Sequence, residues 1–208
     1  MKIIRRKFTI LTAVIAIGLF SVTLVNAQPA QLGQATFSTG TLVVRRPDGI
    51  EDRLRGKGAV ILFEQDVLRT ESNSQALLDF GDGNRIGLNE NSTVQIFTRW
   101  EKTGGFTKIV RAKQGEVWVK TGIGPKPIEV ETSTGTAIVQ NAEINFKVSE
   151  NGQSVLSVVQ GVVQFATAYG WCEVKASTSS SGARGRGCSA PTNVNAQQVA
   201  AWTRDLVR

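Results

Sequence analysis

Apolar and polar residues alternate with a period of two through the middle of the chain, from residue 59 to residue 97. Clusters of Asn, Asp, Gly and Ser divide this stretch into short runs, which is typical of antiparallel strands joined by tight turns. The pair Asp82-Gly83 favours a type I′ turn, in which both central residues have positive φ. We therefore predict an all-β fold. Its expected core positions are Leu78, Phe80, Ile86, Leu88, Val94, Ile96, Val117, Val119, Val163 and Phe165.

The alternation also contains a partial repeat. Residues 40–44, 115–119 and 161–165 each begin with a glycine that is followed by alternating apolar residues. Spaced self-similarity of this kind favours stacked β-coils, that is, a β-solenoid or β-roll, over a plain sandwich. The alternative is that a G-x-V-x-V pattern simply recurs in any β-rich sequence.

Beyond the N-terminal segment, only the C-terminus shows the period of a helix. Asn195 is a suitable cap, and Val199, Trp202 and Leu206 would share one face of a short helix. Residues 177–187 (STSSSGARGRG) precede it, and their composition predicts a flexible, positively charged loop.

The first residues are typical of a secretory signal peptide. Four cationic residues precede the uncharged run 8–25, and Val25-Asn26-Ala27 supplies a cleavage site ahead of Gln28. The alternative is an uncleaved anchor, because the run reaches the lower limit of about 18 residues for a membrane helix. In either case the rest of the chain is expected to be exported, to the periplasm or the extracellular space.

These patterns divide the chain into four segments. We expect a signal peptide at residues 1–27, N-terminal strands and a loop at 28–58, and the β core at 59–175. Residues 176–208 would form a disulfide-closed flexible loop and a C-terminal tail. A chain of 208 residues is long enough for one domain with its own hydrophobic core.

Charge and composition argue against several classes of function. The net charge of +7 includes four cations of the signal segment, so their removal leaves +3, too little to indicate nucleic acid as a partner. Histidine is absent, which removes the commonest general base and metal ligand and excludes Ser-His and Cys-His mechanisms. We expect neither enzymatic activity nor a cofactor.

Two groups of residues were tested as metal or redox sites. Cys172 and Cys188 are the only cysteines, and in an exported chain they are expected to form a disulfide rather than a zinc or redox pair. Asp79, Asp82 and Asn84 lack the spacing of a calcium-binding loop, and a turn explains all three without an ion. No metal site is predicted.

The candidate binding residues are aromatic or cationic. The four tryptophans include Trp100, near the end of a strand, and Trp118, which lies on the face opposite Val117 and Val119. An exposed tryptophan on a sheet often marks a recognition surface. The alternative for Trp118 is that a β-coil or the C-terminal helix covers it. Arg184 and Arg186 are candidates for acidic polysaccharide or lipid headgroups, although a solvated loop is the commoner explanation of two charges.

The turn and strand motifs resemble those of the FecR domain, a bacterial domain best known from transmembrane regulators of iron uptake. The resemblance spans most of the chain after residue 27. The residues that carry it are Asp66-x-Leu68-x-Thr70, Ser74-x-Ala76-x-Leu78, Asp82-Gly83, Ile86-x-Leu88, Asn91-Ser92-x-Val94, residues 114–119, Val130-x-Thr132, Gly135-Thr136 and residues 160–163.

The resemblance implies signalling or scaffolding through contacts with another envelope protein. Typical members carry a cytoplasmic anti-sigma region before a membrane helix, whereas seven residues precede Phe8 here, so the anti-sigma role is not carried over. We therefore expect a non-catalytic, protein-binding module whose partner is an envelope protein. The alternative is a carbohydrate- or cell-wall-binding module, supported by aromatic residues on a coiled β-sheet.

Overall fold

The structure is a computed structural model that describes residues 30–102, 104–122, 124 and 126–206. The expected signal peptide, residues 1–27, lies outside the described residues. The strands are β1 (Gln31–Thr39), β2 (Thr41–Arg45), β3 (Glu51–Arg55), β4 (Gly58–Phe63), β5 (Val67–Thr70), β6 (Gln75–Asp79), β7 (Arg85–Leu88), β8 (Thr93–Trp100), β9 (Phe106–Lys120), β10 (Ile128–Glu131), β11 (Thr136–Val139), β12 (Glu143–Val148), β13 (Ser154–Gln160), β14 (Val162–Thr167), β15 (Gly170–Lys175), β16 (Thr178–Gly182) and β17 (Thr192–Asn193). The helical segments are α1 (Ala196–Val199) and the 3₁₀ helix η1 (Ala201–Asp205).

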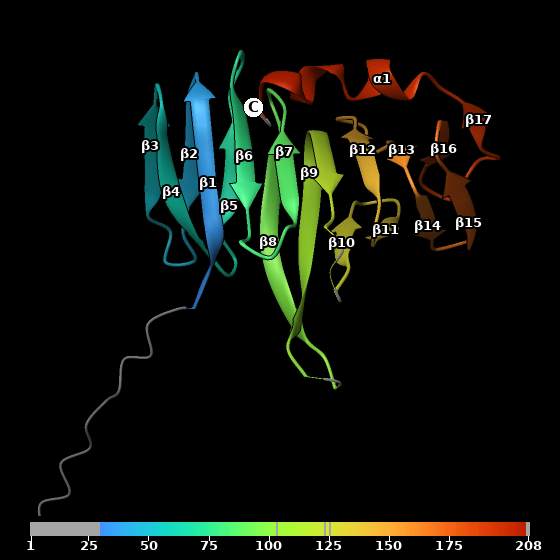
Figure 1. Cartoon of the computed structure of the whole chain (residues 1–208), viewed down its shortest axis with the longest axis horizontal. Helices are drawn as coiled ribbons and strands as arrows, with labels where there is room; N and C mark the ends of the chain where they lie inside the picture. The colour runs from blue at the N-terminus through green and yellow to red at the C-terminus, as the bar shows by residue number, and fades with distance from the viewer. Residues whose placement is uncertain (1–29, 103, 123, 125, 207–208) are drawn as a thin grey trace, which may run out of the picture.

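All strands belong to one open, 17-stranded sheet that folds into two facing layers (Figure 1). Layer A has the order β4-β1-β6-β7-β9-β12-β13-β16-β17. Layer B has the order β3-β2-β5-β8-β9-β10-β11-β14-β15. Strand β9 serves both layers, and its pairing with β10 is the one parallel pairing among the described strands. The all-β, coiled architecture expected from the sequence is confirmed.

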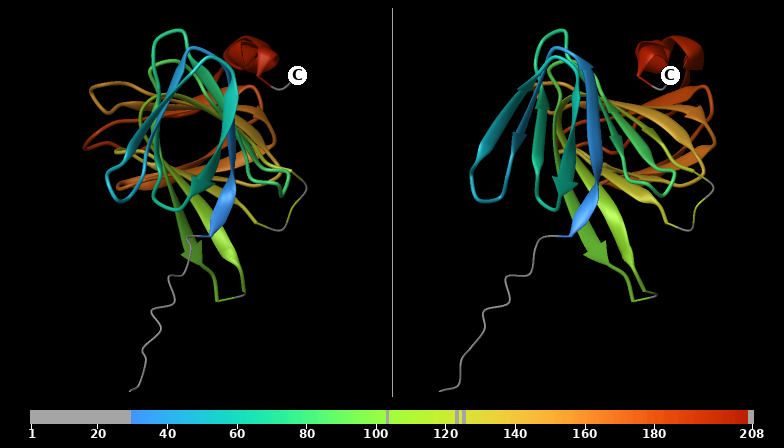
Figure 2. Two further views of the ribbon diagram at one scale, coloured as in Figure 1. Left: turned by 90° about the vertical axis from the view of Figure 1, so that its left-hand side faces the viewer. Right: turned by 60° about the vertical axis from the view of Figure 1, so that its left-hand side comes forward.

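The chain winds as a coil because it passes repeatedly from one layer to the other (Figure 2). The three glycines of the sequence repeat lie at such crossings: Gly40 joins β1 to β2, Gly115 lies within β9, and Gly161 joins β13 to β14. Their φ values of +78°, +92° and +89° fall in the left-handed region, which glycine adopts without steric cost. The repeat therefore marks the corners of the coil.

Each of these glycines packs against an asparagine-containing corner from another crossing. The asparagines, Asn73, Asn91 and Asn141, also have positive φ, which asparagine tolerates better than most residues. A Cβ at Gly40 would lie 2.1 Å from the Ser74 Oγ, and one at Gly115 would lie 2.4 Å from the Cα of Ser92. Each corner therefore combines a left-handed glycine, which has no side chain, with a left-handed asparagine from a neighbouring crossing. This combination allows the two backbone segments to approach each other closely.

The interior between the layers holds the hydrophobic core. Every expected core position is buried, with at most 8% of its surface exposed. Phe146 from layer A meets Phe165 from layer B edge to face, with ring centroids 5.6 Å apart. At the end of the coil the predicted disulfide joins Cys172 of β15 to Cys188, and both residues pack against the core.

Two local expectations need correction. The turn after β6 is not type I′, because Gly81 and Gly83 have positive φ and Asp82 does not. Residues 177–187 are not one flexible loop, because β16 within them pairs with β13. The small residues of that strand allow close approach to the core: a Cβ at Gly182 would lie 3.0 Å from the Phe165 ring.

The C-terminal segment, residues 194–206, crosses the outer face of layer A (Figure 1). Asn195 caps α1 as predicted, since its side chain accepts a hydrogen bond from the Gln198 amide at 3.2 Å. We call this segment the strap. No helix among the described residues has the length and apolarity needed to cross a membrane.

Candidate docking surface on the β8–β9 hairpin

The β8–β9 hairpin extends beyond the body of the protein (Figure 1). Strand β5 pairs with β8 only as far as Gln95, and β10 pairs with β9 only from Lys108 onward. Residues 98–102 and 104–107, which we call the hairpin tip, are therefore a two-stranded projection. A two-stranded projection leaves both of its faces open unless other elements cover them.

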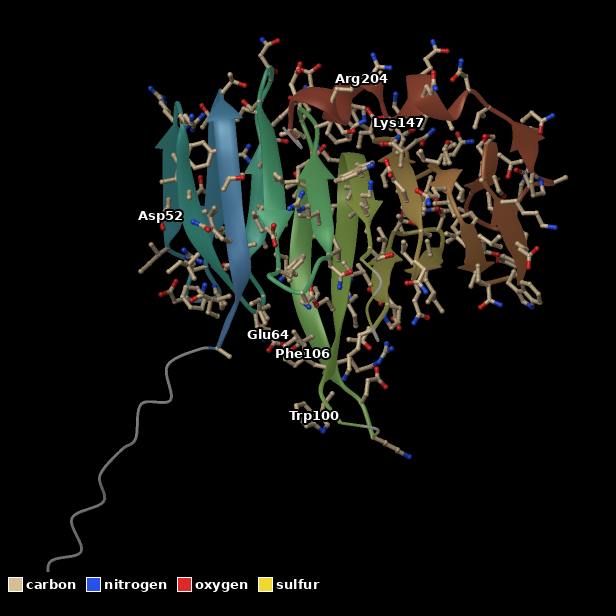
Figure 3. All side chains as sticks on the ribbon, in the orientation of Figure 1. Asp52, Glu64, Trp100, Phe106, Lys147 and Arg204 are labelled. Carbon is tan, nitrogen blue, oxygen red and sulfur yellow. A yellow bond between two sulfur atoms is a disulfide. The ribbon has the colours of Figure 1, made fainter. Side chains whose placement is uncertain are left out.

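The aromatic residues of the hairpin tip lie on the face that forms the core further along the strands. Trp100 follows Ile96 by four residues on the same strand, so both side chains point to the same side of the sheet. Its cross-strand partner is Phe106. Ile96 is fully buried under layer A, whereas Trp100 is 74% exposed and Phe106 is 38% exposed. The apolar face thus continues past the point where layer A ends (Figure 3).

An ion pair marks the boundary between core and hairpin tip. The Nζ of Lys108 pairs with the carboxylate of Asp82, in the turn that ends layer A on this side. The same ammonium lies 5.1 Å from the ring centroid of Phe80 and 5.6 Å from that of Phe106. Cation–π contacts of this kind favour a fixed position for the aromatic ring. The Lys108 ammonium therefore lies against one face of the Phe106 ring, and the rest of the ring is exposed to solvent.

Polar contacts brace the rest of the hairpin tip. Arg99 makes a two-pronged ion pair with Glu129 of β10 and also contacts Glu101. The hydrogen bonds and charge of Glu129 raise the pKa of Arg99. A side-chain hydrogen bond with Thr107, followed by the contact with Arg99, lowers the pKa of Glu101. These contacts hold the hairpin in place, while Trp100 makes none of them.

Trp118 is not the exposed anchor that one interpretation of the sequence offered; the alternative, that the C-terminal segment covers it, is the one that the structure shows. The alternation placed its side chain on the outer face of layer A, which is correct, but only 1% of the residue is exposed. Its cross-strand neighbours are Gly87 and Asn145. A Cβ at Gly87 would lie 3.2 Å from the ring of Trp202 and 3.4 Å from that of Trp118. The strap therefore covers Trp118, in the space that the missing side chain of Gly87 provides.

Hydrogen bonds hold the strap over this face. The Trp202 Nε1 donates to the Asn145 Oδ1 at 3.1 Å, and the Asn145 Nδ2 donates to Glu116 at 2.8 Å. The Trp118 Nε1 donates to Glu143 at 3.0 Å. Both indole nitrogens are thus satisfied, as partly buried tryptophans require. The sequence signal for this contact was the shared face of Val199, Trp202 and Leu206.

Arg184 and Arg186 do not join the hairpin tip. Both lie in the turn after β16, where they line a surface cleft together with Tyr169. Trp100 is not among the residues of that cleft. The candidate residues therefore divide into an aromatic hairpin tip, a buried Trp118 and a separate cationic cleft.

The remaining acidic candidates have structural roles. Asp79 and Asp82 accept hydrogen bonds from the amides of Gly81 and Asn84, at 2.8 and 3.2 Å, which confirms the turn interpretation. Asp66 is buried and paired with Arg46; burial raises the pKa of Asp66, although the Phe63 amide and the charge of Arg46 oppose the shift. Within the described residues, no three His, Cys, Asp or Glu side chains gather in a way that suits a metal ion.

About half of the chain matches a known protein family. Residues 66–164 match the family model described as FecR protein. The chain contains a FecR domain. The matched residues run from the buried Asp66 through β5 to β14 and include the whole hairpin tip. No curated protein matches the sequence.

Two solved structures share the fold of this FecR-domain protein. Both are crystal structures of "a putative anti-sigma factor" from Parabacteroides distasonis, at 1.65 and 2.50 Å resolution. Their TM-scores are 0.54 and 0.56, with 20% sequence identity over 66% of this chain. The likeness covers 64% of the length of those chains, and at this identity it is a likeness of fold.

Proposed function

We propose that this FecR-domain protein is a non-catalytic signalling or scaffold module that binds another protein of the cell envelope through the hairpin tip. The observation that carries the proposal is the uncovered core face of the hairpin, where Trp100 and Phe106 continue the apolar rows of β8 and β9 past the end of layer A. A partner that packs there would complete the missing layer.

The chemistry of the hairpin tip suits a protein partner. Binding energy in protein interfaces concentrates in a few aromatic residues at the centre of a contact, surrounded by polar groups. Trp100 and Phe106 form such a centre, and Arg99, Glu101 and Lys102 are the neighbouring charged residues of the hairpin. The paired charges of Arg99 and Glu129 fix the strands beforehand, so little conformational entropy is lost on docking.

The family and the fold support a regulatory role. FecR domains are a regulatory rather than an enzymatic kind of protein, and the solved structures of similar fold carry the description of anti-sigma factor. The proposal for this chain is limited to protein binding, because at 20% identity the likeness to those structures is one of fold.

Export of the protein is part of the proposal. The disulfide between Cys172 and Cys188 supports an oxidising compartment, since such bonds form and persist outside the cytoplasm. The cationic and apolar pattern of residues 1–27 supports passage through the secretory route. We place the protein in the periplasm or outside the cell.

Co-purification from envelope extracts tests the proposal. Wild-type protein is expected to recover a partner, and Trp100→Ala is expected to lose it while the melting temperature stays unchanged. Trp171→Ala is the matched control, because Trp171 is also an exposed strand tryptophan, with 64% exposure against 74% for Trp100. Equal recovery with Trp100→Ala and wild type would refute docking through the hairpin tip.

A further inference from the structure

A second surface feature, separate from the hairpin tip, lies where three turns meet near the end of the coil. The turns after β10, β14 and β16 line an open cleft of about 470 Å³. Arg184 and Arg186 come from the third turn, Tyr169 from the second, and Thr136 from the strand that follows the first. The volume lies within the range of small-ligand sites, roughly 300–1,000 Å³.

All the charged residues that line the cleft are cationic. Among the residues that line it there are two arginines and no Asp or Glu. Neither Arg184 nor Arg186 has an ion-pair partner within the described part of the chain. Elsewhere the arginines with carboxylate partners are Arg46, Arg53, Arg69, Arg85, Arg99 and Arg111. The cleft therefore offers uncompensated guanidinium groups, which bind carboxylates and phosphates in a two-pronged geometry.

The turn that carries the arginines is held in place. The Arg186 amide donates to the Ala183 carbonyl at 3.2 Å, and Gly185 adopts the positive φ of +73° that the tight turn requires. Directly after the turn, Cys188 is bonded to Cys172 of β15, which shares a hairpin with the Tyr169 turn. The disulfide thus fixes both walls of the cleft to each other.

The other groups in the cleft suit a ligand rich in hydroxyl groups. Tyr169 is 66% exposed and offers an aromatic surface together with a phenolic hydroxyl. Several neighbouring hydroxyls are engaged in the turns themselves, as when Thr132 accepts hydrogen bonds from the amides of Thr134 and Gly135, at 3.3 and 3.1 Å. These bonds make the wall rigid and polar. A hydroxyl-bearing sugar ring that carries an anionic group matches this combination.

We propose that the cleft binds a carboxylate-bearing saccharide, with Arg184 and Arg186 on the carboxylate and Tyr169 along the sugar ring. A membrane surface fits less well, because anionic lipids are recognised by clusters of about 4–8 Lys or Arg residues, and the concave cleft holds two arginines. The saccharide site is independent of the proposed protein-docking function, since the hairpin tip shares no residue with the cleft.

Isothermal titration calorimetry with trigalacturonate tests the site. We expect saturable binding to the wild-type protein and at least a tenfold loss of affinity for the Arg184→Gln/Arg186→Gln variant. The Arg45→Gln/Arg204→Gln variant is the matched control, because it removes the same charge from two exposed arginines outside the cleft and should bind as wild type does. Trp100→Ala should also bind normally, which separates this site from the hairpin tip.

Further titrations identify the ligand chemistry. Methyl-esterified trigalacturonate, which has lost its charges, should bind at least tenfold more weakly, and inorganic phosphate should bind more weakly than trigalacturonate. Absence of saturable binding, or equal loss of affinity in the control variant, would overturn the proposal. If phosphatidylglycerol vesicles bind in an Arg184- and Arg186-dependent way while trigalacturonate does not, the cleft is a lipid-headgroup site instead.

Discussion

Trp100 and Trp118 lie on the two strands of the same hairpin, and their environments are opposite. Trp100 extends the inner face of layer B and is 74% exposed, whereas Trp118 lies on the outer face of layer A and is 1% exposed. In a plain two-layer sheet the inner residue would be buried and the outer one exposed. The difference arises because layer A ends before Trp100, and the strap continues over Trp118.

This contrast shows that a strand pattern assigns a face but does not say what covers it. Trp118 is buried because a segment distant in sequence supplies Trp202 and because Gly87 leaves room for it. Trp100 has no such cover among the described residues. We therefore treat Trp118 as structural and Trp100 as a contact for a partner, and both assignments can be measured.

The largest expected effect is at Trp118. Trp118→Ala removes a fully packed indole and the hydrogen bond that its Nε1 donates to Glu143, so the free energy of unfolding should fall by about 3–5 kcal/mol. Urea denaturation followed by circular dichroism measures this loss. A loss below about 1 kcal/mol would mean that the strap does not cover Trp118 in solution.

Leu88 provides a reference from the core itself. It is fully buried between the layers, and Leu88→Ala should lower the free energy of unfolding by about 2–5 kcal/mol. If Leu88→Ala lowered the free energy of unfolding by only about 0.5 kcal/mol or less, as substitutions at exposed positions do, the β7 face would not be part of the core.

Trp202 tests the strap directly. Trp202→Phe keeps an aromatic ring over Gly87 but removes the hydrogen bond to Asn145, and we expect a loss of about 1–3 kcal/mol in unfolding free energy. Quenching of tryptophan fluorescence by acrylamide should rise only modestly, because Trp118 stays covered. Unchanged stability would show that the strap is held by contacts other than this bond.

A smaller effect is expected at low pH, and only in the hairpin tip. The pKa of Glu101 is below its usual 4.5 in the folded protein, so its contribution to stability is present above pH 4.5 and is lost as the pH falls through the lowered pKa. Hydrogen exchange should then increase at residues 98–107 before it increases around Trp118. Simultaneous loosening of both regions, or none in the hairpin tip, would contradict this assignment.

Much of the fold was accessible from the sequence because the core obeys a simple alternation. Val117 and Val119 point inward as predicted, and the glycines at 40, 115 and 161 mark the corners of the coil. Strand β16 was missed because its Ser- and Gly-rich sequence has no apolar alternation. It is a strand because tertiary pairing with β13 overrides local propensity.

The candidate site was only partly accessible. Trp100 was recognised as a candidate, but its partner Phe106 was not, since their pairing depends on the register of the hairpin. The burial of Trp118 depends on contacts between residues far apart in sequence, such as Trp202 with Asn145, 57 positions apart. Composition gave Arg184 and Arg186, but only the meeting of three turns shows that they line one cleft.

Site-specific photocrosslinking tests the docking claim most directly. A benzophenone amino acid would replace Phe106 in the hairpin tip and, as a matched control, Ile138 on the outer face of layer B; these residues are 38% and 40% exposed. After irradiation in intact cells, we predict a discrete crosslinked envelope protein from position 106 and none from position 138. Crosslinks to the same proteins from both positions, or a discrete product from position 138 alone, would contradict docking through the hairpin tip.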